Sequence, residues 1–137
     1  MELATELAFS AMMASVKLSI NTCKGILTLL NTNLPQSLEV ILYNTDIKYR
    51  LEVISLYVEE LENKNSNSDS LKYCLDGLRY TIDRISMHLQ SIHQKYTDHQ
   101  LKYFSYFRKY DISAEIKNLE KDIMILNKRF KLLISLK

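Results

Sequence analysis

The sequence is poor in residues that break helices. Only two glycines and one proline occur among 137 residues, and tryptophan is absent. Glycine and proline favour turns and interrupt helices, so their scarcity predicts few turns and long elements. With 47% hydrophobic and 25% charged residues, the chain is long enough to bury a core without disulfides or a structural metal. We therefore expect a single helical-bundle domain over residues 1–137.

Export signals and cysteine pairs are also lacking. The two cysteines, Cys23 and Cys74, occupy apolar positions of helical patterns, which predicts reduced, buried thiols typical of a cytosolic protein. The first residues include Glu2 and Glu6, where a secretory signal would carry positive charge. No unbroken apolar run approaches the roughly 20 residues of a membrane-spanning helix. The expected location is cytoplasmic, without a transmembrane helix.

Recognisable catalytic motifs are missing as well. The sequence has no glycine-rich phosphate loop, no G-x-S-x-G elbow and no Cys-x-x-Cys pair. His88 and His93 are five residues apart and do not form an i, i+4 metal pair, so both, with His99, are expected to face solvent. Gly25 and Gly77 lie inside helical patterns and are expected to permit close helix packing. We expect no enzyme, cofactor, metal or small-molecule substrate.

Apolar residues recur at alternating spacings of three and four, which is the pattern of one face of a helix. The pattern predicts helices over about 2–33, 36–62, 69–96, 99–110 and 112–136. The expected fold is all-α, an antiparallel up-down four-helix bundle with a short additional helix before the last long helix. The most regular stripe is Leu71, Leu75, Leu78, Ile82, Ile85, Leu89, Ile92 and Tyr96, and the last is Ile112, Ile116, Leu119, Ile123, Leu126, Phe130 and Leu133.

Short polar segments predict the helix boundaries. The polar cluster at 63–69 reads as a loop, with Ser68 or Asp69 capping the next helix. Residues 97–100 have the T-x-x-Q form of a capping box, so a short helix is expected to start there. Asp111 or Ser113 is expected to cap the last helix. The first helix carries a second apolar stripe, so it is either central or has a second surface to cover: Leu3, Leu7, Ala11, Ala14 and Leu18.

Charge is distributed unevenly along the chain. Residues 1–98 contain nine basic and twelve acidic residues, whereas residues 99–137 contain nine and four. The basic third includes the segment 102–110, which mixes five aromatic residues with three cations. Phe104 and Phe107 there either plug one end of the bundle or belong to a patch that suits anionic lipid or a partner. The near-neutral whole chain does not favour nucleic acid.

The C-terminal third resembles a known family. The pattern from Tyr103 and Phe104 through Phe107 and Tyr110 to the last helix is similar to the N-terminal four-helix bundle of mixed lineage kinase domain-like proteins and related HeLo-type domains. The detailed resemblance covers residues 96–136. It implies a cell-death executioner or signalling module, controlled by an attached kinase-like domain, that oligomerises and moves to anionic membranes on activation.

Two functions follow as hypotheses. In the first, the bundle self-associates and binds anionic lipid; in the second, it is a scaffold that binds a partner helix without membrane contact. In the family, lipid engagement relies on basic first helices, but the first 35 residues here contain only Lys17 and Lys24 as cations. The candidate lipid- or partner-binding residues are Lys102, Tyr103, Tyr106, Arg108, Lys109, Lys117, Lys121, Lys128, Arg129 and Lys131.

Overall fold

The computed structural model describes residues 2–30, 34–64, 68–101 and 111–136, with only the backbone given for residues 2–7 and 101. Within these ranges every regular element is a helix, which confirms the all-α class. The helices are α1 (Glu2–Leu29), α2 (Gln36–Thr45), α3 (Ile47–Asn63), α4 (Asp69–Leu101) and α5 (Ser113–Ser135).

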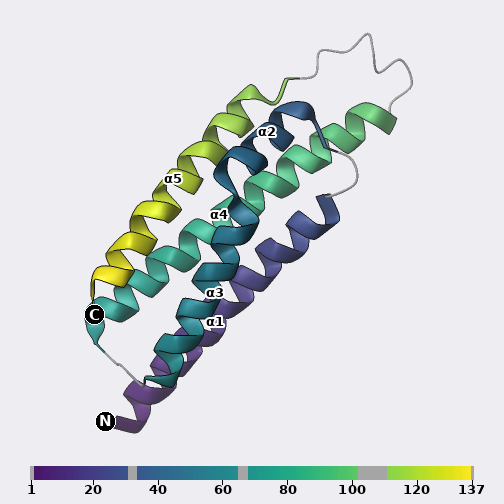
Figure 1. Cartoon of the computed structure of the whole chain (residues 1–137). Coiled ribbons are helices and arrows are strands. Elements are labelled where there is room, and N and C mark those ends of the chain that lie inside the picture. Colours follow the sequence, from purple (N-terminus) through teal and green to yellow (C-terminus); the bar gives the residue numbers. More distant parts are fainter. Residues whose placement is uncertain (1, 31–33, 65–67, 102–110, 137) are drawn as a thin grey trace.

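The helices lie side by side as long rods (Figure 1). α1 and α4 run in one direction, and α2, α3 and α5 run in the other. α4 packs along both α1 and α5, α1 also packs on α3, and α2 contacts α3 and α5. The neighbours α1 and α4 are parallel, and no single connection joins them. A short connection fixes only where two helix ends meet, and the apolar stripes determine which helices pack together.

The core consists of the predicted stripes. Leu71, Leu75, Leu78, Ile82, Ile85, Leu89 and Ile92 of α4 are all buried, and Tyr96 is half-buried. On α5, Leu119, Ile123, Leu126 and Leu133 are buried, while Ile116 and Phe130 pack partly exposed against the same core. The rings of Tyr57 in α3 and Phe130 meet edge to face with centroids 5.6 Å apart. This contact joins α3 and α5.

The expected single helix over 36–62 is wrong, because the chain breaks at Asp46. Asp46 has left-handed backbone angles, φ 49° and ψ 43°, which aspartate tolerates better than most residues. An unbroken helix would place Ile47 opposite the buried Leu38 and Ile41. The break resets the phase, so Ile47 and the residues after it face the core. The backbone N–H of Asp46 donates to the Leu42 carbonyl, 3.1 Å away, and closes α2.

Side chains settle two of the boundary predictions. Ser68 is the cap of α4, since its hydroxyl accepts the Leu71 N–H at 3.1 Å. Before α5, the cap position is occupied by Ile112, without a side-chain cap hydrogen bond, so the prediction of Asp111 or Ser113 as the cap is wrong. The carboxylate of Asp111 still accepts both the backbone N–H of Ser113, at 2.9 Å, and its hydroxyl, at 2.7 Å. The Ser113 hydroxyl hydrogen bond, more than the backbone one, lowers the pKa of Asp111 below its ordinary value.

The predicted helix start at 97–100 is wrong. α4 continues without interruption to Leu101, and the side chain of Gln94 donates to Asp98 one turn further on, at 3.2 Å. A capping box acts only where the chain enters a helix, and no glycine or proline interrupts this segment. The remainder of the expected short helix, residues 102–110, lies outside the described residues.

Candidate functional site

α5 presents a row of lysines to solvent. Lys117, Lys121, Met124, Lys128 and Lys131 follow spacings of four and three residues, and all five are exposed. We call them the α5 lysine face. Lys131 lies 14 positions after Lys117, so the stripe is about 21 Å long at 1.5 Å per residue. No ion pair engages these four lysines within the described part of the chain, and the exposed Glu120 flanks them. The face can therefore attract an anionic surface.

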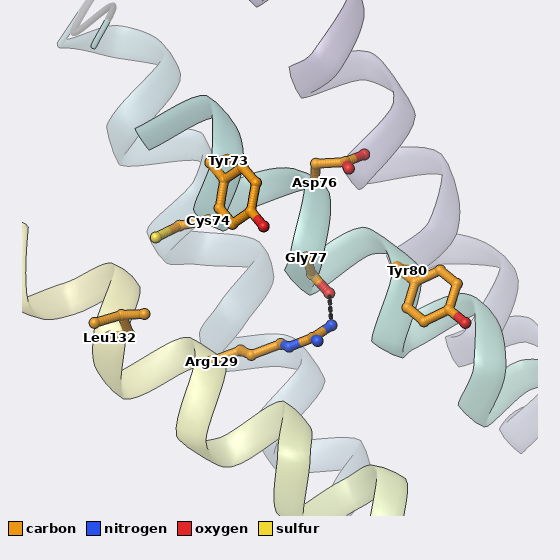
Figure 2. A pocket seen from close by; sticks show the side chains of 7 residues that line it. All are labelled: Tyr73, Cys74, Asp76, Gly77, Tyr80, Arg129 and Leu132. Atoms are coloured by element: carbon orange, nitrogen blue, oxygen red, sulfur yellow. Dashed lines mark hydrogen bonds between the residues drawn. The ribbon is translucent and has the colours of Figure 1, made fainter. Parts of the chain in front are cut away.

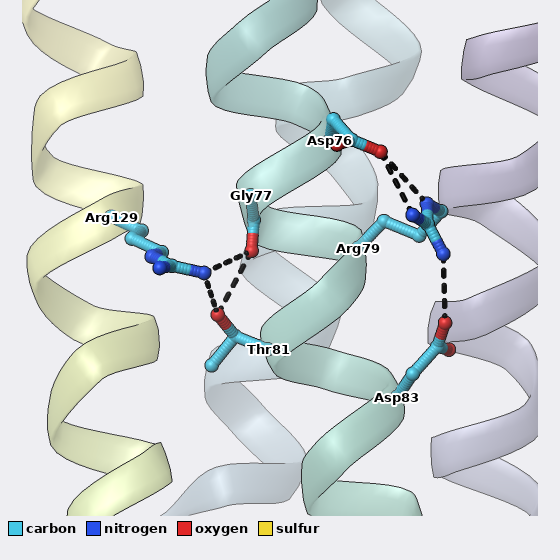
Figure 3. A network of polar contacts seen from close by, with 6 residues as sticks. All are labelled: Asp76, Gly77, Arg79, Thr81, Asp83 and Arg129. Carbon is cyan, nitrogen blue, oxygen red and sulfur yellow. Dashed lines mark hydrogen bonds and ion pairs between the residues drawn. The ribbon is translucent and has the colours of Figure 1, made fainter.

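Other predicted site residues lie elsewhere. Five of them, Lys102, Tyr103, Tyr106, Arg108 and Lys109, lie outside the described residues. Arg129 is described but does not belong to the α5 lysine face, because its side chain turns toward α4 (Figure 3). Its Nη1 donates to the Gly77 carbonyl and to the Thr81 hydroxyl, each at 2.7 Å. Arg129 thus joins α5 to α4 and lies apart from the four lysines.

α1 offers no comparable basic surface. Lys17 pairs with Glu62 of α3 at 2.6 Å, and Lys24 pairs with Glu52 of the same helix. The exposed Leu18 and Leu29 are 68% and 76% accessible. The first helix is therefore not central, and it does have a second, uncharged surface. None of the helices in the described ranges is both long and apolar enough to span a bilayer.

A buried carboxylate lies in the seam between α4 and α5. Asp122 of α5 is 3% exposed, and its Oδ2 lies 2.6 Å from Nε2 of His88 and 3.3 Å from Nε of Arg84. Burying a carboxylate is costly unless cations or donors compensate it. The expectation that His88 faces solvent is wrong, because its side chain is only 21% exposed and lies against Asp122. The sequence of α4 does not reveal that this acid lies opposite.

Tyr80 supports the arginine of this cluster. Nη1 of Arg84 donates to the Tyr80 hydroxyl at 3.4 Å, and its guanidinium carbon lies 5.8 Å from the centre of the Tyr80 ring. The hydrogen bond to Tyr80, followed by the charge of Asp122, raises the pKa of Arg84 above its ordinary value. Arg84 therefore stays charged beside the buried acid.

A pocket of about 280 Å³ opens beside the seam (Figure 2). Tyr73 and Tyr80 stand on either side of Gly77, and Arg129 reaches across from α5. A Cβ atom at Gly77 would meet Arg129 atoms at 3.7 Å, an ordinary contact, so the glycine is not required for close packing. Around Gly25 nothing lies within 4 Å of such an atom. The predicted packing role therefore fails for both glycines.

In the described ranges, no three His, Cys, Asp or Glu side chains gather as metal ligands would. Burial raises the pKa of the Cys23 thiol to about 11, so it is protonated and unreactive at neutral pH. Both cysteines are free, and Cys74 is half-buried rather than buried as expected. Three features stand out: the α5 lysine face, the pocket at Gly77, and the buried Asp122 with its neighbours Arg84 and His88.

Comparison with known proteins gives one relative of note. An uncharacterized protein of Acanthamoeba polyphaga mimivirus is 37% identical over 109 residues, covering 74% of this chain. The chain spans about half the length of that relative, 53%. No family model matches the sequence, and no solved structure matches it.

Proposed function

We propose that this chain is a non-catalytic helical-bundle module that associates with anionic membrane surfaces through the α5 lysine face. The observation that carries the proposal is the stripe of four exposed lysines without ion pairs among the described residues. A basic residue near an anionic bilayer contributes about 1 kcal/mol of attraction. Four of them favour reversible binding that depends on ionic strength.

The finer architecture belongs to the same proposal. α2 and α3, which share one direction, act as a single rod, and four rods form an up-down bundle of the HeLo type. Self-association, a role in cell death and control by an attached kinase-like domain come from the resemblance of residues 96–136. The family's basic first helix has no counterpart here, because Lys17 and Lys24 pair with glutamates of α3. The proposal therefore assigns lipid contact to α5.

Vesicle co-sedimentation tests this function. The purified chain should bind vesicles that contain anionic lipid, should release from them at high salt, and should not bind neutral vesicles. Dye release from the same vesicles and light scattering of the protein report membrane damage and self-association. Equal binding to both kinds of vesicle, or no binding at low salt, would refute the assignment.

A scaffold function is the second candidate. It is favoured by the exposed Tyr73, Tyr80 and Leu132 around the pocket, which are 83%, 52% and 57% accessible. Under this alternative the chain binds a partner helix without touching lipid, and reversal of charges on the α5 lysine face leaves partner binding unchanged.

A further inference from the structure

α4 carries a second regular stripe on the side opposite its buried one. Tyr73, Gly77, Tyr80, Arg84 and Met87 follow spacings of four, three, four and three residues. We call them the α4 outer stripe. Tyr73, Tyr80 and Met87 are 83%, 52% and 66% exposed, although they are large and apolar or aromatic. This spacing is the one by which a helix meets another helix along a seam. α5 reaches two members of the stripe, Gly77 through Arg129 and Arg84 through Asp122, and the other three remain exposed.

The pocket within this stripe holds a cation without an acid. Arg129 is half-buried, and the hydrogen bonds of its guanidinium go to the neutral Gly77 carbonyl and Thr81 hydroxyl. No carboxylate of the described residues lies within ion-pair distance of it, in contrast to Arg84, which faces Asp122. Asp76 lines the pocket, but its Oδ1 is bound by Arg79 at 2.8 Å on another side of α4 (Figure 3).

We propose that the α4 outer stripe docks an amphipathic α-helix of a protein partner, and that an acidic side chain of this helix pairs with Arg129. The stripe is about 21 Å long, four helical turns, which suits the apolar face of such a helix. Gly77 leaves a recess between the two tyrosines into which a partner side chain fits. The charge of Arg129 selects a carboxylate, and Tyr73 and Leu132 enclose the ion pair.

This site is separate from the membrane surface proposed above. Its residues are mainly aromatic and apolar around Arg129, whereas the α5 lysine face consists of four lysines and Met124 on one helix. Failure of lipid binding would leave the docking proposal intact, and the reverse also holds.

Peptide binding to the whole chain tests the proposal. The probes are stapled helical peptides of about four turns, with leucines at alternating spacings of three and four residues. Each peptide of the set carries one glutamate, and the set moves this glutamate through every position that is not a leucine. Each has a matched peptide with glutamine in place of glutamate. Fluorescence anisotropy should show at least one glutamate register that binds roughly tenfold more tightly than its glutamine partner.

Two variants at one exposed position make the test specific. Leu132→Glu places a carboxylate within one turn of Arg129 and should reduce binding of the selected peptide roughly tenfold or more, whereas Leu132→Gln should retain it. Leu132 is 57% exposed, and thermal melting checks that both variants fold as the parent does. The proposal is overturned if no peptide binds, if glutamate and glutamine peptides bind equally, or if the two variants behave alike. It is also overturned if Leu132→Glu reduces vesicle binding while no peptide binds, since the face would then contact lipid.

Discussion

α1 and α5 bury similar stripes but present opposite outward surfaces. In each helix the core residues recur every three or four positions, and both helices pack along α4. The two lysines of the described part of α1 pair with glutamates of α3, and its outward residues include Leu18 and Leu29. The four lysines of the α5 lysine face have no such partners among the described residues. The core pattern thus determines the fold, and the outward face distinguishes the two helices.

The two helices also contact α4 by different means. The α4–α5 seam contains polar contacts at intervals of about two turns: Arg129 with Gly77 and Thr81, Asp122 with Arg84 and His88, and Glu115 with Lys95. The α1–α4 contact includes Cys23, whose thiol pKa is raised chiefly by burial. The α4–α5 seam is therefore the more sensitive of the two to changes of charge.

The largest expected effect concerns α4, the helix on which both α1 and α5 pack. Leu78→Ala removes a fully buried side chain of α4 and should lower the free energy of unfolding by about 2–5 kcal/mol, because it leaves a cavity. Urea denaturation followed by circular dichroism measures the loss. Met124→Ala, at a 60% exposed position, is the control and should have little effect. Equal, small losses in both variants would mean that α4 is not the common packing partner.

The next effect should be confined to the α4–α5 seam. His88→Leu leaves the buried Asp122 with Arg84 alone and should lower the unfolding free energy by about 1–3 kcal/mol. His93→Leu, on the same helix and outside the ion pairs of the described residues, is the matched control. If both variants melt alike, the contact of His88 with Asp122 does not stabilise the seam.

On the α1 side, a glycine offers a gain of stability. Gly25 lies inside α1, four residues before its end, has no positive φ, and has nothing within 4 Å of the position of a Cβ atom. Gly25→Ala should raise the unfolding free energy by about 0.5–1 kcal/mol, because alanine loses less backbone entropy on folding. The same denaturation curve measures it. A loss instead would indicate that another molecule covers this face of α1 in solution.

The smallest expected effect is a dependence of stability on pH. It comes from the ion pair of Lys95 with Glu115 at one end of the α4–α5 seam. The hydrogen bond from Lys95, followed by the backbone N–H of Glu115 itself, lowers the pKa of Glu115 below its ordinary 4.5. A carboxylate whose pKa is lower in the folded state stabilises the fold above its unfolded pKa, and this contribution disappears as pH falls below about that value. Lys95 is half exposed, so solvent screening limits the gain to less than about 1 kcal/mol.

Glu115→Gln tests this dependence. The free energy of unfolding of this variant should depend less steeply on pH below about pH 5 than that of the parent. The two values should be closest at the acid end of the pH range. Glu120→Gln, an exposed acid of the same helix, is the control. A parent slope retained in Glu115→Gln would contradict the assignment to this ion pair.

The sequence predicts the core well and the partners of polar residues poorly. The stripes of α4 and α5 could be read directly because helical spacing is a local property. The break at Asp46 has a trace in the sequence, since Ile47 is out of phase with Leu38 and Ile41. Neither Arg129 beside Gly77 nor His88 beside Asp122 follows from spacing, because each depends on which helices are neighbours. The α4 outer stripe is present in the sequence as a second pattern of three and four, but spacing alone does not show which of its residues stay exposed.

The central claim, that α5 and not α1 meets anionic lipid, can be tested with two double variants in one vesicle assay. Lys121→Glu with Lys128→Glu should lower the partition coefficient onto anionic vesicles roughly thirtyfold or more, at about 1 kcal/mol for each lysine lost. Lys17→Gln with Lys24→Gln should leave it unchanged, because those lysines pair with Glu62 and Glu52. An equal loss in both double variants, or a loss only in the α1 variant, would contradict the account.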